Sequence, residues 1–388
     1  MSSSKRIYLD NNSTTAAAPE VVDAMTRAFT AGYGNPASQH AEGRAARALL
    51  EEARETICRY LGAQVDEFRG DRLILTSGGT ESNNLALRGI SAQRRGQILV
   101  SAIEHPSVSR VVDDLARRGT PVLQIPVNSH GVLDLDALQQ LLRVETSLVS
   151  VMLGNNETGV LQPIQEISAI CELAEVPLHT DATQAVGKIA VDFRQLAVSA
   201  LTFAAHKFHG PRGIGGLLIK NSVSIQADMF GGFQQSSLRP GTECVELALG
   251  MQKALELCCQ DQQATTDALG QLRDRLESQL RQGWPDLVVL SDKVARLPQT
   301  LAIAFPGVDR QSLVMALDLA GIACSTGSAC ASGSSEVSPT LSAMGCPPPI
   351  VDSAIRLSVS RLNSMAEIDA AAESILSVVL RQKRVKTH

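Results

Sequence analysis

Residues 177–211 read PLHTDATQAVGKIAVDFRQLAVSALTFAAHKFHGP. Two short segments in this stretch, 177–180 and 200–204, have the length and composition of buried strands. Asp181 follows the first segment directly, and Lys207 follows the second shortly before a Gly-Pro turn. Ligands in open α/β sheets bind at the carboxyl ends of the strands. The stretch therefore predicts two strands of an α/β sheet that place an acid and an amine at a ligand-binding edge.

The same alternation of strand and helix runs through the first two-thirds of the chain. One helical segment shows the expected spacing, because Leu50, Ala53, Ile57 and Leu61 fall on one face. A repeated order of strand and helix is typical of a mostly parallel sheet with helices on both faces. The predicted fold class is therefore α/β, with a seven-stranded sheet built from residues 73–76, 98–102, 122–127, 148–153, 177–180, 200–204 and 216–219.

Toward the C-terminus this rhythm changes. The pattern predicts one long helical stretch over 245–281, then a mixture of strands and helices that includes a strand at 355–360. Ser364 and Glu367, three residues apart, predict a capping box at the start of the last helix. We expect a large domain of residues 16–258 and a smaller α+β domain formed by residues 1–15 and 259–388.

Composition excludes several classes of protein. Hydrophobic residues make up 44% of the 388 residues and charged residues 19%, which is typical of a folded chain with a large core. The formal net charge of -5 argues against nucleic acid as the main partner. No segment approaches the roughly 20 apolar residues of a membrane span, and the first residues lack the apolar core of a signal peptide. We therefore expect a cytoplasmic protein without a membrane partner.

The eight cysteines include no C-x-x-C pair, so the sequence gives no sign of a zinc ribbon or a thioredoxin motif. Most are expected to be small apolar residues of the core, and Cys324 fits this role because it ends an apolar strand. Cys330 differs, because it lies in the run of small residues 325–335. That setting suits an exposed thiol with a lowered pKa.

The two polar residues of the opening stretch each allow two interpretations. Asp181 either caps the next helix or accepts a bond from a protonated ring nitrogen, which would make that ring a better electron sink. Lys207 is either a solvated surface residue or a partly desolvated nucleophilic amine. The second alternative is what a Schiff base with an aldehyde cofactor requires.

Other polar residues near predicted strands are ambiguous in the same way. Residues 77–82, SGGTES, form either a simple helix start or a phosphate-binding turn. His206 suits a phosphate or a backbone carbonyl, and His105 either starts a helix or stacks on a flat cofactor and moves protons. Arg356 lies in an apolar strand and needs a carboxylate from the protein or from a substrate. Residues 155–159, NNETG, turn a loop or bind a carboxylate.

Taken together, these segments resemble the cysteine desulfurases of the NifS/IscS type, which are class V aminotransferases and fold-type I pyridoxal-phosphate enzymes. The similarity runs nearly from end to end, from residues 8–15 to residues 355–361. Each motif alone is ambiguous, but seven motifs in the family's order are highly specific. These seven motifs lie at residues 34–38, 77–84, 155–159, 179–188, 206–216, 239–242 and 325–330.

The resemblance implies how the cofactor, pyridoxal 5'-phosphate, would be held. Lys207 would form the Schiff base, Asp181 would pair with the pyridine nitrogen, and Gln184 would bond the phenolic oxygen. His105 would stack on the ring and assist proton transfers. The residues implied to bind the phosphate are Gly79, Thr80 and His206. The usual serine two positions before that histidine is Ala204 here, so one phosphate contact of the family is missing.

The resemblance also implies a substrate, a reaction and a dimer. Asn156, which borders the cofactor, and Arg356 would hold the carboxylate of L-cysteine, and Cys330 would accept the sulfur. Thr242 would reach the phosphate of the neighbouring subunit, which implies a homodimer with shared sites. The products would be L-alanine and a persulfide on Cys330, whose sulfur would pass to an acceptor protein such as an iron–sulfur scaffold.

Two other functions are compatible with the sequence. One is a related pyridoxal-phosphate enzyme, a selenocysteine lyase or a cystine C–S lyase, and such an enzyme without a persulfide step does not need Cys330. The other is a non-catalytic sulfur carrier or adaptor that has kept the fold, and Ala204 is the residue that favours it most.

Overall fold

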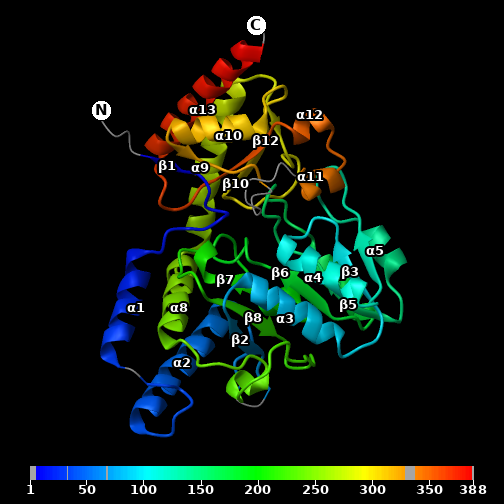
Figure 1. The fold of residues 1–388 in the computed structure, drawn as a ribbon, viewed down its shortest axis with the longest axis vertical. Helices are drawn as coiled ribbons and strands as arrows, with labels where there is room; N and C mark the ends of the chain where they lie inside the picture. The colour runs from blue at the N-terminus through cyan, green and yellow to red at the C-terminus, as the bar shows by residue number, and fades with distance from the viewer. Residues whose placement is uncertain (1–5, 33, 67–68, 328–336, 387–388) are drawn as a thin grey trace.

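The structure is a computed structural model that describes residues 6–32, 34–66, 69–327 and 337–386 (Figure 1). Its largest sheet has seven strands in the order β2-β8-β7-β6-β5-β3-β4. All strand pairs from β7 to β4 are parallel, and β8 is antiparallel to both of its neighbours. The strands are β2 (Arg72–Thr76), β3 (Gln97–Ser101), β4 (Val122–Ile125), β5 (Thr146–Ser150), β6 (Leu178–Asp181), β7 (Ala200–Ala204) and β8 (Gly215–Ile219).

The prediction of a mostly parallel seven-stranded sheet is therefore confirmed, and the strand limits differ by a few residues. The largest differences concern the segment predicted at 148–153, where β5 covers Thr146–Ser150, and the segment predicted at 122–127, where β4 ends at Ile125. Asp181 is the last residue of β6 and not the first residue after it. This change leaves the carboxylate at the same edge of the sheet.

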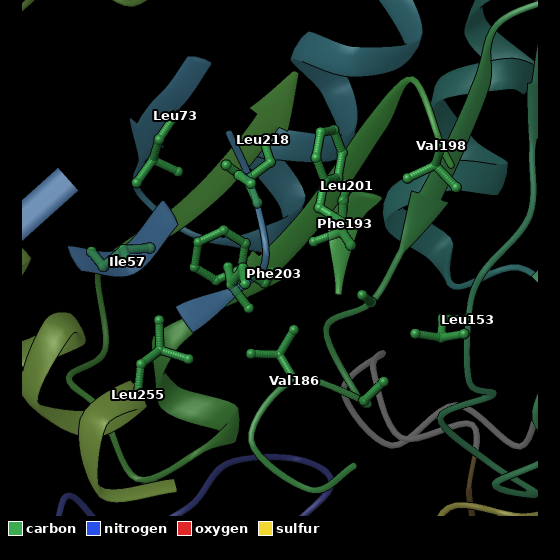
Figure 2. Close-up of a cluster of buried hydrophobic side chains, with 14 of the residues drawn as sticks. Ile57, Leu73, Leu153, Val186, Phe193, Val198, Leu201, Phe203, Leu218 and Leu255 are labelled. Carbon is green, nitrogen blue, oxygen red and sulfur yellow. The ribbon is translucent and has the colours of Figure 1, made fainter. Parts of the chain in front are cut away.

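Helices cover both faces of this sheet, as the alternation of side chains along its strands requires. Leu218 of β8 belongs to the core shared with α2 (Ala41–Tyr60) and α8 (Val245–Cys259), which also contains Ile57, Phe203 and Leu255 (Figure 2). Its neighbour Leu217 belongs to the core on the other face, under α3 (Gly79–Ser91) and α4 (Pro106–Arg117). The shorter or more peripheral elements of this region are α1 (Pro19–Ala31), α5 (Leu135–Leu141), α6 (Ile164–Leu173), α7 (Phe193–Leu196), η1 (Ala205–Lys207) and η2 (Gln234–Ser237).

A second group of elements follows α8. Three antiparallel strands, in the order β12-β10-β9, lie together with α9, α10 and α13 in the upper part of Figure 1. A separate parallel pair joins β1 to β11. These elements are β1 (Ile7–Tyr8), α9 (Gln262–Gly283), β9 (Val288–Val289), β10 (Thr300–Ala304), α10 (Arg310–Leu319), β11 (Ile322–Ala323), α11 (Pro339–Ala343), α12 (Pro348–Val351), β12 (Ala354–Ser358) and α13 (Met365–Lys386).

The N-terminal segment packs with this second group, because Ile7 and Leu9 share a buried cluster with residues of α9, α10 and α13. This packing supports the assignment of residues 1–15 to the smaller domain, and the division of the chain at 15/16 and 258/259 remains our proposal. Among the residues that the structure describes, no helix is both long enough and apolar enough to cross a membrane.

Two predictions about helices have different outcomes. The single stretch predicted over 245–281 is wrong, because α8 ends at Cys259 and α9 begins at Gln262. Asp261 leaves the helical conformation there, and its side chain accepts the N–H of Ala264, which caps α9. The predicted capping box is confirmed: Ser364 N donates to Glu367 Oε2 at 3.1 Å, and Glu367 N donates to Ser364 Oγ at 3.2 Å.

Candidate active site

A cavity of about 260 Å³ lies at the carboxyl edge of the seven-stranded sheet. The parallel strands β3, β5, β6 and β7 end there, and β2 runs in the same direction, so the segments that follow all five strands converge. This is the edge at which open α/β sheets bind ligands. Eight of the residues predicted from the sequence line the cavity: Gly79, Thr80, His105, Asn156, Asp181, Gln184, His206 and Lys207.

Lys207 ends the short 3-10 turn η1 that follows β7. Its Nζ donates hydrogen bonds to the carbonyls of Asn12 at 2.6 Å and Ser13 at 2.8 Å. The loop that follows the turn is closed by a backbone hydrogen bond, because Gly210 N donates to Ala205 O at 2.9 Å. The amine is therefore held by backbone carbonyls at the wall of the cavity and is not a solvated surface group, which was the alternative interpretation of the sequence.

The helix-cap interpretation of Asp181 is wrong, because residues 183–188 form turns and the next helix begins only at Phe193. Its Oδ1 accepts the N–H of Thr183 at 2.9 Å within this turn, and Oδ2 accepts from Asn83 Nδ2 at 2.7 Å. Asn83 lies fully buried on α3 and also donates to Ser107 Oγ at 2.8 Å. Sequence reasoning missed Asn83, and the available signal was an amide side chain on the apolar face of a predicted helix.

The N-terminus of α3 forms the wall of the cavity next to Lys207. The helix begins at Gly79, after Gly78 with φ 153°, a conformation that favours glycine. The first N–H groups of a helix have no partner within it and attract anions. Thr80 lies in this first turn, and Ala204 lines the cavity beside it. The arrangement suits a phosphate group, although Ala204 offers no hydroxyl.

Burial keeps the histidine next to the lysine neutral. Burial, together with the nearby positive charge of Lys207, lowers the pKa of His206 to about 4. The His206 Nδ1 lies 3.1 Å from Thr14 Oγ1. When one nitrogen of a neutral imidazole forms a hydrogen bond, the second nitrogen can still form a hydrogen bond with a ligand.

His105 is both the first residue of a helix and a residue of the cavity. It is the N-cap of α4, and its Nδ1 accepts the N–H of Ser107 at 3.1 Å. Burial lowers the pKa of His105; Asp181 opposes this shift, and Lys207 and Arg356 add to it. The ring is therefore neutral at pH 7 and is held by one nitrogen, so its other nitrogen is available for proton transfer.

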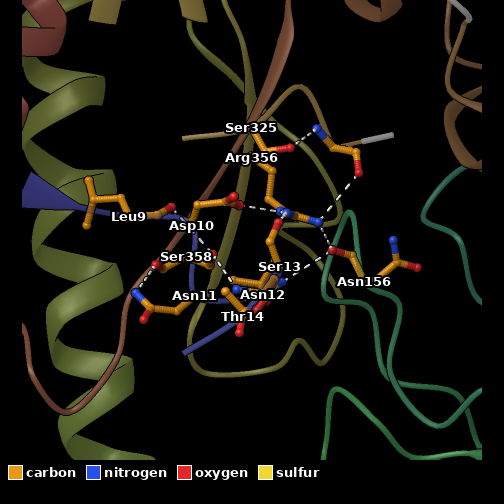
Figure 3. A network of polar contacts seen from close by, with 12 residues as sticks. Leu9, Asp10, Asn11, Asn12, Ser13, Thr14, Asn156, Ser325, Arg356 and Ser358 are labelled. Carbon is orange, nitrogen blue, oxygen red and sulfur yellow. Dashed lines mark hydrogen bonds and ion pairs between the residues drawn. The ribbon is translucent and has the colours of Figure 1, made fainter. Parts of the chain in front are cut away.

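Arg356, on β12, lies behind the wall of the cavity in a polar network (Figure 3). Its side chain is only 4% exposed, and it forms an ion pair of 2.8 Å with Asp10. The guanidinium also donates to Ser13 Oγ and to the carbonyl of Asn156, both at 2.8 Å. The carboxylate that this buried arginine needs is thus supplied by the protein, from a residue 346 positions away in the chain.

The segment 155–159 forms a tight turn that carries Asn156. Asn155 Oδ1 accepts the N–H groups of Glu157 and Thr158, each at 2.9 Å. Glu157 is buried and accepts from Ser338 Oγ at 2.6 Å and Thr340 Oγ1 at 3.0 Å. Burial raises the pKa of Glu157 despite these bonds. The turn is therefore tied to the second group of elements, a contact that the sequence pattern did not reveal.

Asn12 connects the N-terminal segment to the cavity and was also missed by sequence reasoning. Its carbonyl accepts from Lys207 Nζ and from Gln184 Nε2, the latter at 2.9 Å. Within the described residues, Gln184 Oε1 and Thr183 Oγ1 are buried and have no hydrogen-bond partner. Buried polar atoms are rarely left unpaired. These atoms therefore fit a cavity made for a polar ligand, and pyridoxal 5'-phosphate, with its ring nitrogen, phenolic oxygen and phosphate, meets this description.

The structure does not bring every predicted site residue to the cavity. Thr242 is exposed and lines another pocket together with Thr76 and Gly213, so it contacts no part of the cavity in its own chain. Cys330 lies in the segment 328–336, outside the described residues. Cys324 packs at the border of the second core, where burial raises its pKa to about 12, in agreement with a structural role.

Comparisons with known proteins agree on one family. Residues 7–371 match the model of the class-V aminotransferases. The chain is 41% identical over 383 residues to a cysteine desulfurase from Sinorhizobium fredii, covering 97% of this chain and 98% of the relative. It is 36% identical over 384 residues to the cysteine desulfurase NifS from Azotobacter vinelandii, covering 98% and 94%. A solved structure described as a NifS-like protein superposes with a TM-score of 0.89 at 32% identity, covering 97% of this chain and all of the other.

These matches extend over nearly the whole chain and include all the segments that form the cavity. The relatives are fold-type I enzymes that depend on pyridoxal 5'-phosphate, and the amine, the acid and the unpaired polar atoms of the cavity fit this cofactor. The chain belongs to the class-V aminotransferase family.

Proposed function

We propose that this chain is a cysteine desulfurase that converts L-cysteine to L-alanine and transfers the sulfur first to its own Cys330. The observation that carries the proposal is the convergence of Lys207, Asp181 and His105 on one cavity. That cavity lies in a chain whose similarity to cysteine desulfurases extends over 97% of its length.

The residues around the cavity suggest how pyridoxal 5'-phosphate would be held. Lys207 would hold the aldehyde carbon, Asp181 would face the ring nitrogen, and Gln184 would face the phenolic oxygen. The first turn of α3, with Gly79 and Thr80, would bind the phosphate together with His206. When bound, the cofactor supplies an electron sink that stabilises negative charge at the substrate Cα.

The protein's own groups would move the protons. The Lys207 amine would accept the proton from the substrate Cα, since a neutral amine is the form that accepts a proton. His105 is neutral because it is buried, so it can accept or donate a proton at the substrate. Asn83 would keep Asp181 oriented through its 2.7 Å hydrogen bond.

The substrate carboxylate would be held by Arg356 and Asn156, and this contact would direct the sulfur of cysteine toward Cys330. The thiolate of Cys330 would attack the substrate sulfur, so that an S–S bond forms while the Cβ–S bond breaks. Alanine would then leave and the persulfide would stay on the enzyme. The small residues around Cys330 suit a segment that carries sulfur from one site to another.

We also propose a cytoplasmic homodimer that passes its sulfur to an acceptor protein, such as an iron–sulfur scaffold. The exposure of Thr242 supports the dimer, because this residue needs a second subunit in order to reach a cofactor phosphate. The names NifS and IscS among the relatives support a role in iron–sulfur assembly.

The test measures alanine and sulfide formed from L-cysteine in the presence of a thiol reductant. The wild-type protein with bound cofactor should be yellow and active, and Lys207→Ala should lose both properties. Cys330→Ala should stay yellow but lose alanine formation by at least about a hundredfold, because the proposed sulfur acceptor is then missing. Cys244→Ala, which removes an exposed cysteine outside the cavity, is the matched control and should retain activity.

If Cys330→Ala still formed alanine from L-cysteine at the wild-type rate, the desulfurase assignment would be wrong. A lyase that acts on selenocysteine or cystine would then explain the chain better. A wild-type protein that stayed colourless after addition of the cofactor would instead point to a non-catalytic carrier.

A further inference from the structure

The guanidinium of Arg356 has almost no free hydrogen-bond donor. An arginine side chain carries five N–H bonds. The two on Nη2 are directed to Asp10 Oδ1 and Ser13 Oγ, each at 2.8 Å. Nη1 donates to the carbonyl of Asn156 at 2.8 Å and makes a longer contact of 3.5 Å with the carbonyl of Gly327. Only Nε is buried without a partner among the described residues.

A substrate carboxylate that binds this guanidinium through two hydrogen bonds must therefore displace an existing acceptor. Bidentate binding uses two N–H groups on one edge of the guanidinium, and the single free N–H on Nε provides only one. The substrate must consequently take the place of Asp10, Ser13 or one of the two backbone carbonyls.

The position of each acceptor decides which one leaves. Ser13 and Asn156 line the cavity, and Asp10 is not among its lining residues. The carbonyl of Asn156 is fixed by the turn 155–159, whose backbone is bonded to the Asn155 side chain. The Ser13 hydroxyl rotates about one bond, and among the described residues it accepts its hydrogen bond from Arg356 (Figure 3). Ser13 is therefore the acceptor that faces the substrate and is easiest to move.

We propose that the Ser13 hydroxyl occupies the substrate carboxylate's place on Arg356 and turns away when the amino acid binds. This inference rests on the proposed function, because it assumes an amino acid substrate in the cavity. Asp10 keeps the guanidinium in place through its ion pair with the same nitrogen, Nη2. Ser13 then acts as a specificity residue. A ligand gains binding free energy from Arg356 only if its acceptor group binds the guanidinium more strongly than a hydroxyl does, and a carboxylate meets this condition.

The proposal predicts that Ser13 weakens the binding of substrate. Breaking its hydrogen bond to a charged donor opposes substrate binding, and the free hydroxyl recovers only part of this loss in the cavity. Ser13→Ala leaves an N–H of Arg356 available before substrate arrives. The KM for L-cysteine of the holoenzyme should then fall by about two- to tenfold.

The experiment compares Ser13→Ala and Ser13→Thr with the wild-type holoenzyme, using L-cysteine and L-cysteinamide as substrates. L-Cysteinamide lacks the carboxylate, so its KM and kcat/KM should not change in Ser13→Ala. Ser13→Thr keeps the hydroxyl, so its KM for L-cysteine should equal or exceed that of the wild type. Thermal unfolding of both variants shows whether the fold is preserved.

An unchanged or raised KM for L-cysteine in Ser13→Ala would overturn the proposal, as would an equal change with both substrates. A similar fall in KM for Ser13→Thr would also overturn it, because the hydroxyl would then play no part. Failure of the proposed function is a separate result, since it appears in the wild-type protein as the absence of alanine formation.

Discussion

At the scale of single residues, the most unusual group outside the proposed chemistry is the amine of Lys188. Its side chain is 6% exposed, and its Nζ has no hydrogen-bond partner among the described residues. It lines a small enclosed cavity with Lys207, Cys258 and Arg361. Burial lowers the pKa of Lys188 to about 7, and the positive charge of Lys207 contributes to this shift.

The buried amine predicts a pH-dependent cost to folding. The pKa of Lys188 is near 7 in the folded protein and near 10.5 when exposed, so the unfolded chain binds more protons between these values. The destabilising effect of Lys188 on the fold therefore decreases as the pH rises from 7 to 10.5. Lys188→Met should stabilise the cofactor-free protein, and the gain should be larger at pH 6.5 than at pH 9.5 by about 2 to 3 kcal/mol.

Urea unfolding of the cofactor-free protein at the two pH values checks this prediction. Lys220→Met replaces an exposed lysine and should show no such difference between the two pH values. An equal gain in stability for Lys188→Met at the two pH values would contradict the prediction. It would mean that the amine of Lys188 is protonated to the same extent in the folded and the unfolded protein.

At the scale of elements, helix ends show what sequence patterns do and do not reveal. The capping box of α13 was predictable, because Ser364 and Glu367 interact over three positions of the chain. The break between α8 and α9 was not predicted, although the buried positions of the two helices are interrupted there, between Cys258 and Leu269. Asp261 was the local signal, since an aspartate within a helical pattern is a good N-cap residue.

The capping box gives a direct test of local stability. Ser364→Ala removes the side-chain oxygen that accepts the N–H of Glu367, so the first turn of α13 loses one hydrogen bond. The free energy of unfolding should fall by about 1 kcal/mol, as for other N-cap serines. Ser374→Ala, in the middle of the same helix, is the control and should be neutral or slightly stabilising because alanine favours helix. Chemical unfolding of both variants distinguishes them, and equal losses would contradict the role of the cap.

At the scale of the whole molecule, the sheet and the cavity were predictable to different degrees. The strands and the polar residues at their ends follow each other in sequence, so Lys207, Asp181 and His105 could be placed at one edge of a sheet. The contacts of Asp10, Asn12 and their neighbours could not be predicted. They join the N-terminal segment to residues far away in the chain, such as Ser358, which Asn12 N meets at 2.9 Å. No local pattern encodes such a pairing.

The whole molecule should also be sensitive to acid, because three histidines between β6 and the turn after β7 are neutral in the fold. Burial lowers the pKa of His179, His206 and His209 to about 4 in each case. An exposed histidine has a pKa near 6.5, so the unfolded chain binds more protons between pH 4 and 6.5. The contribution of these histidines to the free energy of unfolding is therefore fully present above pH 6.5. It is lost as the pH falls toward 4.

His209→Asn tests this prediction, because asparagine does not titrate in this range and tolerates the φ of 65° at this position. Between pH 7 and pH 4 the cofactor-free wild-type protein should lose about 2 kcal/mol more stability than the variant. The measurement is the urea midpoint across this range, with His130→Asn as the control outside this cluster. A variant that lost stability as steeply as the wild type would show that His209 is not held neutral by the fold.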